Sequence, residues 1–408
     1  MSELLTEPEL KPTEAAPKAD WLYGFWYPAL RSDRVRGTRM AKAMLLGIPL
    51  VLGRKRSGEP FAMRDACPHR GIPLSYGHFD GERVQCSYHG WCFEPRSGQC
   101  LEIPSLTSHD KLKVERIFAA AFPCEERDRF FWVFMPEPGT GLAALRQSVL
   151  KGPGFSHAEN NAQDGVASAA DGDLPPIPRV PTFSEKYVLT HLAAELPCSV
   201  DHGIIGLMDP AHGPFVHQAW WWRSGKSIHE KEKRFEPIPN GFRMSAHTPS
   251  ANSAPYKLMR LGAAKPGGNA AKPGGNVETT IDFVLPNMRF ETVRSGEGWF
   301  STLTTVTPIT AGHCRIDVRA AWNIFRWATP LVLPIGRFFG KKFIRQDQRT
   351  MEQQAEGLKH NPNLMLIDDA DRPAKWYFAL KQAHLEARRS GRPMQHPMSG
   401  PVTLHWRS

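Results

Sequence analysis

The sequence lacks the long apolar runs and the leader segment that would send it to or across a membrane. None of its 408 residues belong to an uncharged apolar stretch of about 18 residues, the length that spans a bilayer. Residues 1–20 are acidic and rich in Pro and Ala, whereas a secretory leader is basic and then apolar. The sequence therefore predicts a cytoplasmic protein whose residues 1–20 form a disordered tail.

Cysteine is scarce in this sequence. There are seven cysteines, an odd number in a chain too large to need disulfide staples. Two of them stand beside histidines in a pattern typical of metal sites. We therefore expect thiols that are free or bound to metal, in a reducing compartment.

Clustered charge and cofactor fingerprints are also absent. The net charge is +10, but Lys and Arg are spread along the chain and form no block interleaved with aromatic residues. This excludes nucleic acid as an expected partner. A plant-type Cys-x4-Cys-x2-Cys run and a Gly-x-Gly-x-x-Gly fingerprint are missing, so we expect no flavin or nicotinamide site in this chain.

Composition changes along the chain and predicts two domains. Residues 21–138 contain short β-like runs between Gly, Pro and Asp turns, which predicts a small antiparallel β domain. The runs used for this prediction are 43–52, 83–87 and 130–135. Residues 139–182 have little periodicity and are rich in Gly, Ala, Asn and Pro, as expected of a linker or excursion.

The second predicted domain covers residues 183–395. Strand-like runs alternate there with helical segments, which predicts an α+β domain built on an antiparallel sheet. The strand-like runs are 187–192, 279–285 and 301–308. Residues 396–408 are predicted to be a tail.

The most specific motif combines two cysteines and two histidines. Cys67 and His69 form Cys-x-His, and Cys86 and His89 form Cys-x2-His after sixteen intervening residues. Zinc accepts the same four ligands, but zinc sites usually pair Cys with Cys and His with His in each loop. One Cys and one His in each loop fit two irons, one held by both thiolates and the other by both imidazoles.

This motif resembles the [2Fe–2S] site of Rieske proteins, which implies Cys67, His69, Cys86 and His89 as cluster ligands. Respiratory Rieske proteins carry two further cysteines where this chain has Ile72 and Tyr88. The resemblance is therefore to the oxygenase and ferredoxin branches of the family. A ferredoxin would end near residue 138, whereas this chain continues to residue 408.

A second motif, Asp-x2-His-x4-His, is formed by Asp209, His212 and His217. Two histidines five residues apart are more often structural than metal ligands. Beside the cluster motif, the segment resembles the iron-binding stretch of Rieske oxygenases. The resemblance implies His212 and His217 as ligands of a mononuclear Fe(II), and Asp209 as the carboxylate linking His212 to the cluster ligand His89. Relatives often carry Asn three residues before this Asp, where this chain has Gly206.

The same resemblance implies a carboxylate ligand on a downstream helix. Residues 341–358 have helical periodicity, and Asp347 lies on the stripe predicted to face inward. Asp347 is therefore the predicted third ligand. The alternatives are three aspartates in the loop 367–373, namely Asp368, Asp369 and Asp371.

Membership of this family implies an oxygenase with a helix-grip catalytic domain, in which an antiparallel sheet is covered by helices. Its co-substrate would be O2, with NAD(P)H used indirectly through a separate reductase or ferredoxin. The implied substrate is a small apolar, aromatic or cyclic molecule that is hydroxylated, demethylated or desaturated by a homotrimer. The alternative is a Rieske electron carrier whose second domain only binds a partner.

Three further segments carry weaker expectations. The aromatic run Trp220–Trp222 could line a substrate cavity or serve as an anchor, and the repeat at 263–276 indicates a duplicated surface loop. The apolar run 327–339 is too short to span a bilayer. We expect it in the core or over the entrance to the iron site, and the less favoured alternative is contact with a membrane surface through its apolar residues and basic flanks.

Overall fold

The computed structural model describes residues 20–140, 174–178, 188–217, 228–247, 277–324 and 326–408. Three expectations lie outside these residues: the tail before Asp20, the aromatic run at 220–222 and the repeat at 263–276. Most of the expected linker lies outside them as well. The chain forms two compact units, Met1–Pro178 with Ile309–Ala311, and Arg179–Pro308 with Gly312–Ser408. The boundaries expected from the sequence, 138 and 183, lie on either side of this division.

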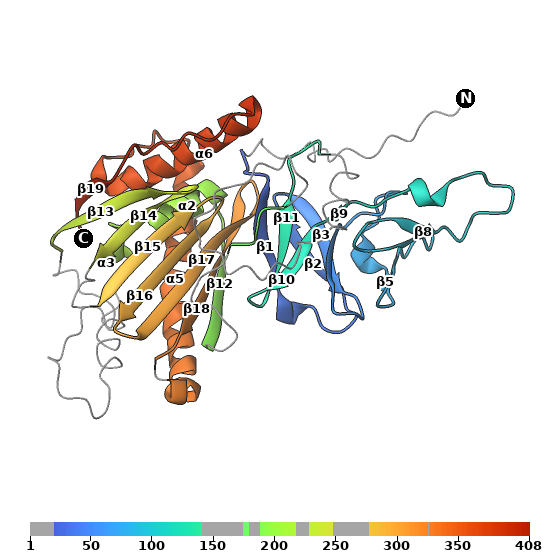
Figure 1. Ribbon diagram of the computed structural model, residues 1–408, viewed down its shortest axis with the longest axis horizontal. Helices are drawn as coiled ribbons and strands as arrows, with labels where there is room; N and C mark the ends of the chain where they lie inside the picture. The colour runs from blue at the N-terminus through green and yellow to red at the C-terminus, as the bar shows by residue number, and fades with distance from the viewer. Residues whose placement is uncertain (1–19, 141–173, 179–187, 218–227, 248–276, 325) are drawn as a thin grey trace. The chain divides into compact units, whose positions relative to one another are not determined.

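Unit 1 consists of small antiparallel sheets, as predicted (Figure 1). One sheet has the order β1-β11-β10, the second β2-β3-β4-β9 and the third β5-β6-β7-β8. The longer strands are β1 (Phe25–Arg31), β2 (Ala41–Leu45), β3 (Ile48–Arg54), β4 (Pro60–Arg64), β10 (Cys124–Arg127) and β11 (Phe130–Met135). The shorter ones are β5 (His78–Phe79), β6 (Val84–Gln85), β7 (Cys92–Phe93), β8 (Cys100–Glu102) and β9 (Ala121–Phe122).

The predicted strand at 43–52 is wrong, because the structure divides it into the hairpin β2–β3. Leu46 and Gly47, at the tip, have φ values of 50° and 71°. Positive φ at both central residues is typical of the tight turn that suits the twist of a hairpin. The prediction at 130–135 is confirmed, since β11 covers those residues and all six are buried.

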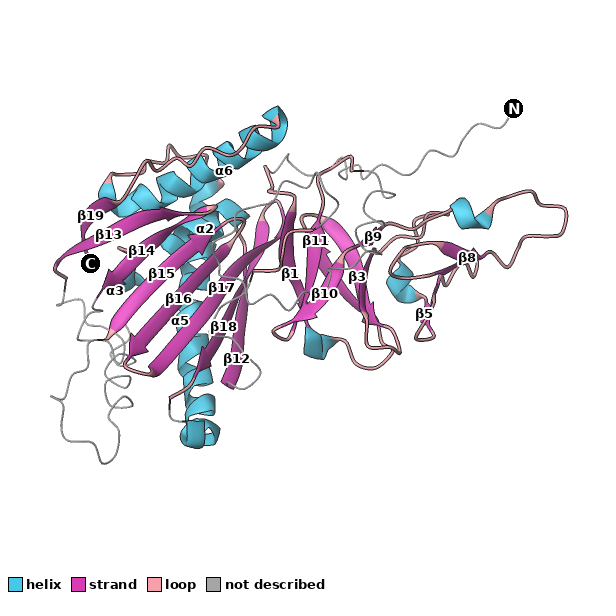
Figure 2. Ribbon diagram, viewed as in Figure 1, coloured by secondary structure: helices cyan, strands magenta, loops and turns pink. Residues whose placement is uncertain are grey.

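Unit 2 is built on an eight-stranded antiparallel sheet, which confirms the predicted α+β class (Figure 2). The strand order is β12-β18-β17-β16-β15-β14-β13-β19. Their bounds are β12 (Val188–Leu196), β13 (Glu230–Ile238), β14 (Gly241–His247), β15 (Glu278–Val284), β16 (Met288–Ser295), β17 (Gly298–Thr310), β18 (His313–Trp322) and β19 (Val402–Arg407).

The predicted tail at 396–408 is wrong for its last residues, which form strand β19. This strand pairs with β13 from Glu230↔Arg407 to Phe235↔Val402. Leu404 and Trp406 are buried while their neighbours are exposed, the alternation of a strand with one face on the core. The end of the chain is therefore part of the sheet.

The principal helices of unit 2 are α2 (Val200–Met208), α3 (Gly213–Val216), α5 (Thr329–Leu358) and α6 (Arg372–Ser390). Figure 2 shows α5 running behind the strands of the sheet. This helix begins at Thr329, well before the predicted start at residue 341, and includes Pro334. Pro330, the second residue of α5, suits a helix start, because a backbone N–H in the first turn would have no partner within the helix.

The run 327–339 is mostly solvent-exposed, so placing it in the core was wrong. Trp327 is 85% exposed and Leu331 is 72% exposed. None of the helices in the described ranges combines the length and apolar character needed to cross a bilayer. The outward-facing residues of this run are taken up below.

Candidate metal centres

Two loops of unit 1 carry the Cys/His motif and share one backbone frame. In each loop, the backbone N–H of the cysteine donates a hydrogen bond to the carbonyl of the residue five positions later. The carbonyl of the same cysteine accepts a hydrogen bond from the N–H of the glycine four positions later. The donor–acceptor pairs are Cys67–Ile72 and Gly71–Cys67, at 2.8 and 2.9 Å, and Cys86–Trp91 and Gly90–Cys86, at 2.9 and 3.1 Å. The two loops thus present their cysteines in the same local geometry.

Glycine is required where each loop turns back. Gly71 has a φ of 74° and Gly90 a φ of 72°, in the left-handed region that side chains disfavour. A Cβ at Gly90 would also lie 3.0 Å from Pro104 Cγ. These two glycines fix the loop shape that sets the spacing of the motif.

The side chains of the motif separate into a buried pair and an outer pair. Cys67 and Cys86 are each 3% exposed, whereas His69 is exposed and His89 half-buried. The imidazole centroids of His69 and His89 are 4.6 Å apart, and His69 stacks on Trp91 at 4.7 Å. Burial, with the neighbouring Cys86 thiol, raises the pKa of the Cys67 thiol to about 11. A metal at the thiols would remove this preference for the protonated form, because it binds thiolate.

The spacing of these four side chains does not match a single-ion site. Among the described residues, His212, His217 and Asp347 are the group whose donor atoms all lie within 4.8 Å of one another. The four motif residues do not form such a group, although a tetrahedral zinc site would hold all of its donors that close. The wider arrangement fits a cluster with two irons.

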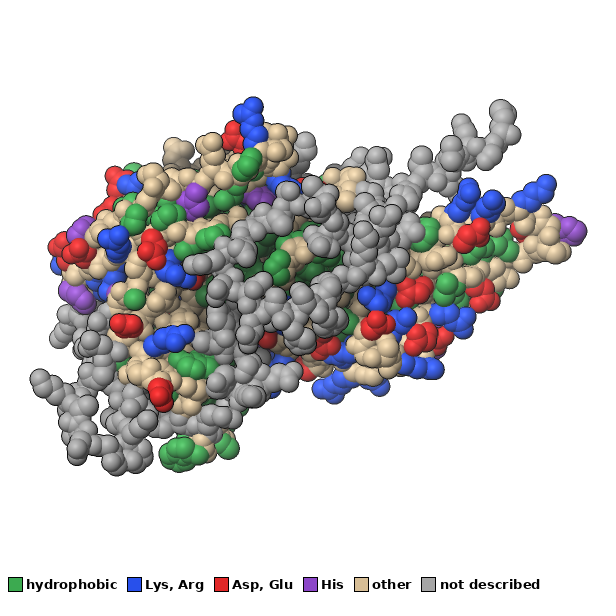
Figure 3. Space-filling view, in the orientation of Figure 1, with side chains coloured by type: hydrophobic (Ala, Val, Ile, Leu, Met, Phe, Trp, Pro, Cys, Tyr) green, Lys and Arg blue, Asp and Glu red, His purple; other side chains and the backbone are tan. Residues whose placement is uncertain are grey.

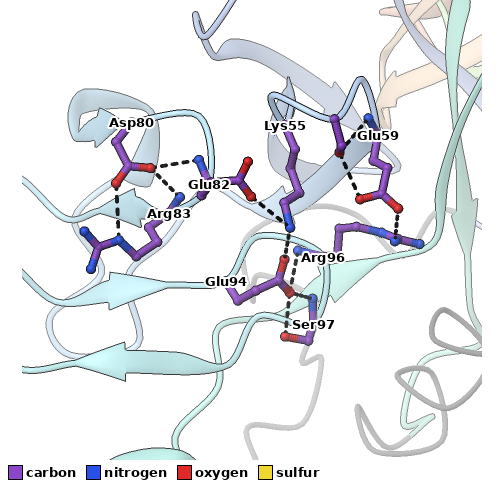
Figure 4. A network of polar contacts seen from close by, with 9 residues as sticks. Lys55, Glu59, Asp80, Glu82, Arg83, Glu94, Arg96 and Ser97 are labelled. Atoms are coloured by element: carbon purple, nitrogen blue, oxygen red, sulfur yellow. Dashed lines mark hydrogen bonds and ion pairs between the residues drawn. The ribbon is translucent and has the colours of Figure 1, made fainter.

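A polar network braces the strands that flank these loops (Figure 4). Lys55, which follows β3, lies 3.3 Å from Glu82 and 3.4 Å from Glu94. Arg96 pairs with Glu59 at 2.6 Å. Since the second loop joins β6 to β7, contacts on both sides of that hairpin hold it against the β3–β4 turn.

The second centre is assembled in unit 2 from segments far apart in the sequence. His212 and His217 flank α3, and Asp347 lies in the middle of α5. His217 Nε2 is 3.2 Å from Asp347 Oδ1. The imidazoles of His212 and His217 are 5.3 Å apart and steeply tilted. The structure thus brings together the three residues predicted as iron ligands.

His217 is fixed from two sides by α5. Its Nδ1 lies 3.1 Å from Gln346 Oε1, and its ring stacks on Phe343 with centroids 3.6 Å apart. The side chain is 2% exposed, yet Nε2 makes no hydrogen bond to any residue that the structure describes. A buried ring nitrogen without a hydrogen bond, beside a carboxylate and a second imidazole, suits a divalent metal. Nothing in the sequence points to Gln346 as a partner of His217.

Asp209 ends α2 and shapes the turn that leads to His212. Its Oδ1 accepts from the Ala211 amide at 2.6 Å and from the His212 amide at 3.3 Å. His212 Nδ1 is 2.7 Å from the Asp209 backbone oxygen but 3.7 Å from its Oδ2. The imidazole of His212 is therefore oriented by the carbonyl, whereas the sequence reasoning assigned this role to the carboxylate.

The alternative aspartates point to other partners. Asp368 pairs with Lys375 at 3.0 Å, and this neighbouring charge lowers the pKa of Asp368. Asp369 accepts from the His405 amide at 2.9 Å, and Asp371 accepts from the Ile367 amide at 2.8 Å. These three residues are absent from the described group of metal-donor side chains.

Helix α2, which precedes the His212–His217 segment, is held in place by contacts with α6 and α5. Asp201 accepts hydrogen bonds from Tyr377 and from Lys381 of α6, and Lys381 is 4% exposed. A Cβ at Gly206 would lie 3.3 Å from Met351 Cε of α5. Helix α2 thus packs closely against α5 at Gly206.

Two family models match this chain. Residues 25–118 match the Rieske [2Fe-2S] domain, and residues 204–394 match the vanillate O-demethylase oxygenase C-terminal domain. The first match contains both Cys/His loops, and the second contains Asp209, His212, His217 and Asp347. The chain belongs to the Rieske non-haem iron oxygenase family. Its second unit is of the vanillate O-demethylase type, and the family implies one Rieske cluster and one non-haem iron.

Relatives and solved structures agree with this family. The chain is 27% identical over 313 residues to chlorophyllide a oxygenase, chloroplastic, of Chlamydomonas reinhardtii, covering 75% of this chain and 39% of the relative. It is 30% identical over 199 residues to the oxygenase component of chloroacetanilide N-alkylformylase of Rhizorhabdus wittichii, covering 49% and 47%. The alignments thus span less than half of these two relatives. NdmA of Pseudomonas putida CBB5 with caffeine shares the fold, with a TM-score of 0.62, 18% identity and coverage of 93% and 96%.

Proposed function

We propose that this chain is the terminal oxygenase of a multicomponent system that oxidises a small organic molecule with O2. The observation that carries the proposal is the group formed by His212, His217 and Asp347, two imidazoles and one carboxylate in contact. This donor set leaves positions open on a ferrous ion, as in other non-haem iron oxygenases. The Rieske domain in the same chain supplies a means of delivering electrons.

Each motif residue has a proposed role. Cys67 and Cys86 would hold one iron of the cluster, and His69 and His89 would hold the other. When bound, the cluster supplies single electrons and the mononuclear iron activates dioxygen. Gln346 Oε1 would accept a hydrogen bond from the Nδ1–H of His217, which leaves Nε2 available to a metal.

Asp209 is proposed as the link between the two metal sites. Its Oδ1 is engaged by the amides of the following turn, and Oδ2 lies 3.7 Å from His212 Nδ1. A carboxylate placed in this way can accept a hydrogen bond from a second imidazole, and the family resemblance names His89. Asp209 would then orient His212 through its backbone carbonyl and His89 through its carboxylate.

The proposed substrate is an apolar aromatic or cyclic molecule, and the proposed reaction is hydroxylation, with loss of a methyl group or desaturation as related outcomes. Support comes from the second family model, which is named for a demethylase, and from a relative named for N-dealkylation chemistry. The solved relative NdmA is crystallised with caffeine, a methylated heterocycle. O-methyl and N-methyl aromatic compounds are therefore the first class to assay.

The proposed partners are a separate reductase or ferredoxin, which passes electrons from NAD(P)H, and two further copies of this chain in a homotrimer. The exposed His69 edge of the cluster loops provides a place for electron transfer from another protein. The net charge of +10 favours an acidic donor. We propose the cytoplasm as the compartment, since none of the seven cysteines, all of which the structure describes, forms a disulfide.

Single-turnover oxidation tests the proposed function. Chemically reduced protein is mixed with oxygenated buffer and a panel of methylated aromatic compounds, and products are followed by mass spectrometry with 18O2. The expected result is incorporation of 18O into at least one product, or, for demethylation, release of formaldehyde together with the demethylated product. The competing carrier function predicts reoxidation of the cluster without any product, with the Asp347→Ala variant behaving as the parent does.

A further inference from the structure

Helix α5 carries an outward face with a regular sequence pattern. Six residues follow one another at alternating steps of four and three: Leu331, Ile335, Phe338, Lys342, Arg345 and Arg349. Residues at these steps lie along one face of a helix. The first three are apolar and the last three are basic, so this face, here called the α5 outer face, has an apolar half and a basic half.

The apolar half is turned toward solvent. Leu331 is 72% exposed, Ile335 52% and Phe338 56%, and Trp327, in the turn just before the helix, is 85% exposed. Single exposed apolar residues are ordinary, but a contiguous row of four marks a contact surface. Figure 3 shows hydrophobic side chains gathered at the lower end of unit 2, where Figure 1 places the orange lower end of α5.

The opposite side of the helix is attached to the sheet. A Cβ at Gly340 would lie 2.3 Å from Leu192 Cδ1, so α5 approaches β12 closely at this glycine. Arg337 Nε donates to Thr190 Oγ1 at 3.2 Å. Since β12 is at one end of the strand order, the helix is held against an outer strand while its other side remains outward.

Charge on this segment has one sign. Between Trp327 and Gln346 the sequence has no Asp or Glu, and it has four basic residues: Arg337, Lys341, Lys342 and Arg345. Lys342 Nζ lies 4.6 Å from the centre of the Phe338 ring, where the apolar half meets the basic half. Apolar residues beside Lys and Arg, with an aromatic residue at one end, are typical of helices that lie in a membrane interface.

We infer that the α5 outer face docks on the surface of a bilayer that contains anionic lipid. The apolar half would enter the boundary between headgroups and acyl chains, and the basic half would contact lipid phosphates. Two copies of this face cannot pair in parallel, because Lys342, Arg345 and Arg349 would oppose the same residues, so a second copy would have to meet the face with a different surface. The inference takes up the less favoured alternative of membrane contact and does not depend on the proposed oxygenase activity.

Vesicle co-sedimentation of the full chain with its metals bound tests the inference. Vesicles of phosphatidylcholine alone are compared with vesicles containing about a third phosphatidylglycerol, at low salt and at high salt. The expected result is binding to the anionic vesicles that weakens at high salt. Absence of binding, or equal binding to both vesicle types, would overturn the inference.

Two double variants locate the surface. Leu331→Gln with Ile335→Gln removes the apolar half, and Lys342→Gln with Arg345→Gln removes basic charge. Each is expected to weaken vesicle binding at least tenfold. The matched control, Leu364→Gln with Met365→Gln, changes two residues that are 63% and 82% exposed in a different segment and should bind as the parent does.

Two further outcomes would count against the membrane. If the control weakens binding as much as the α5 variants, attraction is not specific to the α5 outer face. If Leu331→Gln with Ile335→Gln lowers the molar mass measured by light scattering, the face joins copies of this chain instead. Unchanged circular dichroism verifies that each variant is folded, and product formation with a soluble substrate is measured separately so that loss of activity is not mistaken for loss of docking.

Discussion

The two metal centres differ in how much of the chain is needed to build them. The cluster loops lie within residues 67–91, and each is closed by two local backbone hydrogen bonds. In the second centre, His217 bonds a side chain 129 residues away and packs against a helix from the end of the chain. One centre is therefore specified by local geometry, and the other exists only when the sheet and helices of unit 2 are assembled.

This contrast predicts that the centres can be lost separately. Cys67→Ser should remove the cluster, about two irons per chain and the visible colour, while Asp347→Ala should remove about one iron and leave the colour unchanged. Both variants should lose all product formation. Metal analysis and absorption spectra on the same samples check this. If either substitution emptied both sites, the idea of independent centres would fail.

Changing Asp209, the proposed link between the two metal sites, should impair turnover without removing either metal. Asp209→Ala is expected to keep both metals and abolish turnover, since it removes the carboxylate that we propose as the link between the two metal sites. Asp209→Asn keeps an oxygen for the Ala211 amide, so it preserves the turn and isolates the effect of charge. Single-turnover kinetics of cluster oxidation measure the step. Near-normal turnover in both variants would disprove the bridging role.

The assembled centre should be more sensitive to the stability of the sheet. Asp317 of β18 is 1% exposed and pairs with Arg315 at 2.7 Å and with His191 of β12 at 2.8 Å. Burial alone would raise the pKa of Asp317, but Arg315 and then His191 outweigh it and lower this pKa. Asp317→Ala is expected to destabilise unit 2 by about 3–5 kcal/mol, because it removes a buried carboxylate that pairs with both Arg315 and His191.

The sign of the pH dependence follows from that lowered pKa. The stabilisation from ionised Asp317 is fully present above the carboxyl pKa of the unfolded chain, about 3.9, and is lost as pH falls through the lower folded pKa. The gap in melting temperature between the parent and Asp317→Ala should thus be wide at pH 7 and narrow below about pH 4. Heating at pH 7 should release the mononuclear metal of the variant before its colour fades. A gap that widened in acid would contradict the assignment.

Gln346 should matter for metal affinity more than for folding. Gln346→Ala removes the acceptor for His217 Nδ1, and loss of such a contact typically weakens metal binding by about 10–100-fold. Titration of apoprotein with Co(II), followed by its visible absorption, gives the affinity without any turnover. The exposed Gln353 on the same helix supplies the control, and equal affinities for the two alanine variants would remove Gln346 from the centre.

The smallest expected effect concerns Gly206. Gly206→Asn places the residue common in relatives against Met351, and overpacking of this kind costs about 1–3 kcal/mol. Met351→Ala made in the same chain should restore part of the melting temperature by opening space. An unchanged melting temperature for Gly206→Asn alone would show that α2 and α5 are less tightly packed than the contact implies.

How much the sequence predicts follows the same contrast. The four cluster residues and their glycines were identifiable because a short loop carries all of its own constraints. Predicting Asp347 as a ligand required both the family resemblance and the helical periodicity of its segment. Gln346 could not be predicted, because the sequence does not indicate which helix position contacts a histidine far away in the chain. The start of α5 was predicted too late, since Pro330 and Pro334 disfavour a helix. Strand β19 was predicted to be a tail, because six residues of alternating polarity are only a weak indication of a strand.

The most direct test of two separate iron centres is low-temperature EPR of anaerobically purified protein, with iron and zinc assayed on the same sample. We predict a red-brown protein with about three irons per chain, and the low average g value of a histidine-ligated [2Fe–2S] cluster after reduction. A colourless protein with zinc at Cys67, His69, Cys86 and His89 would contradict the oxygenase account.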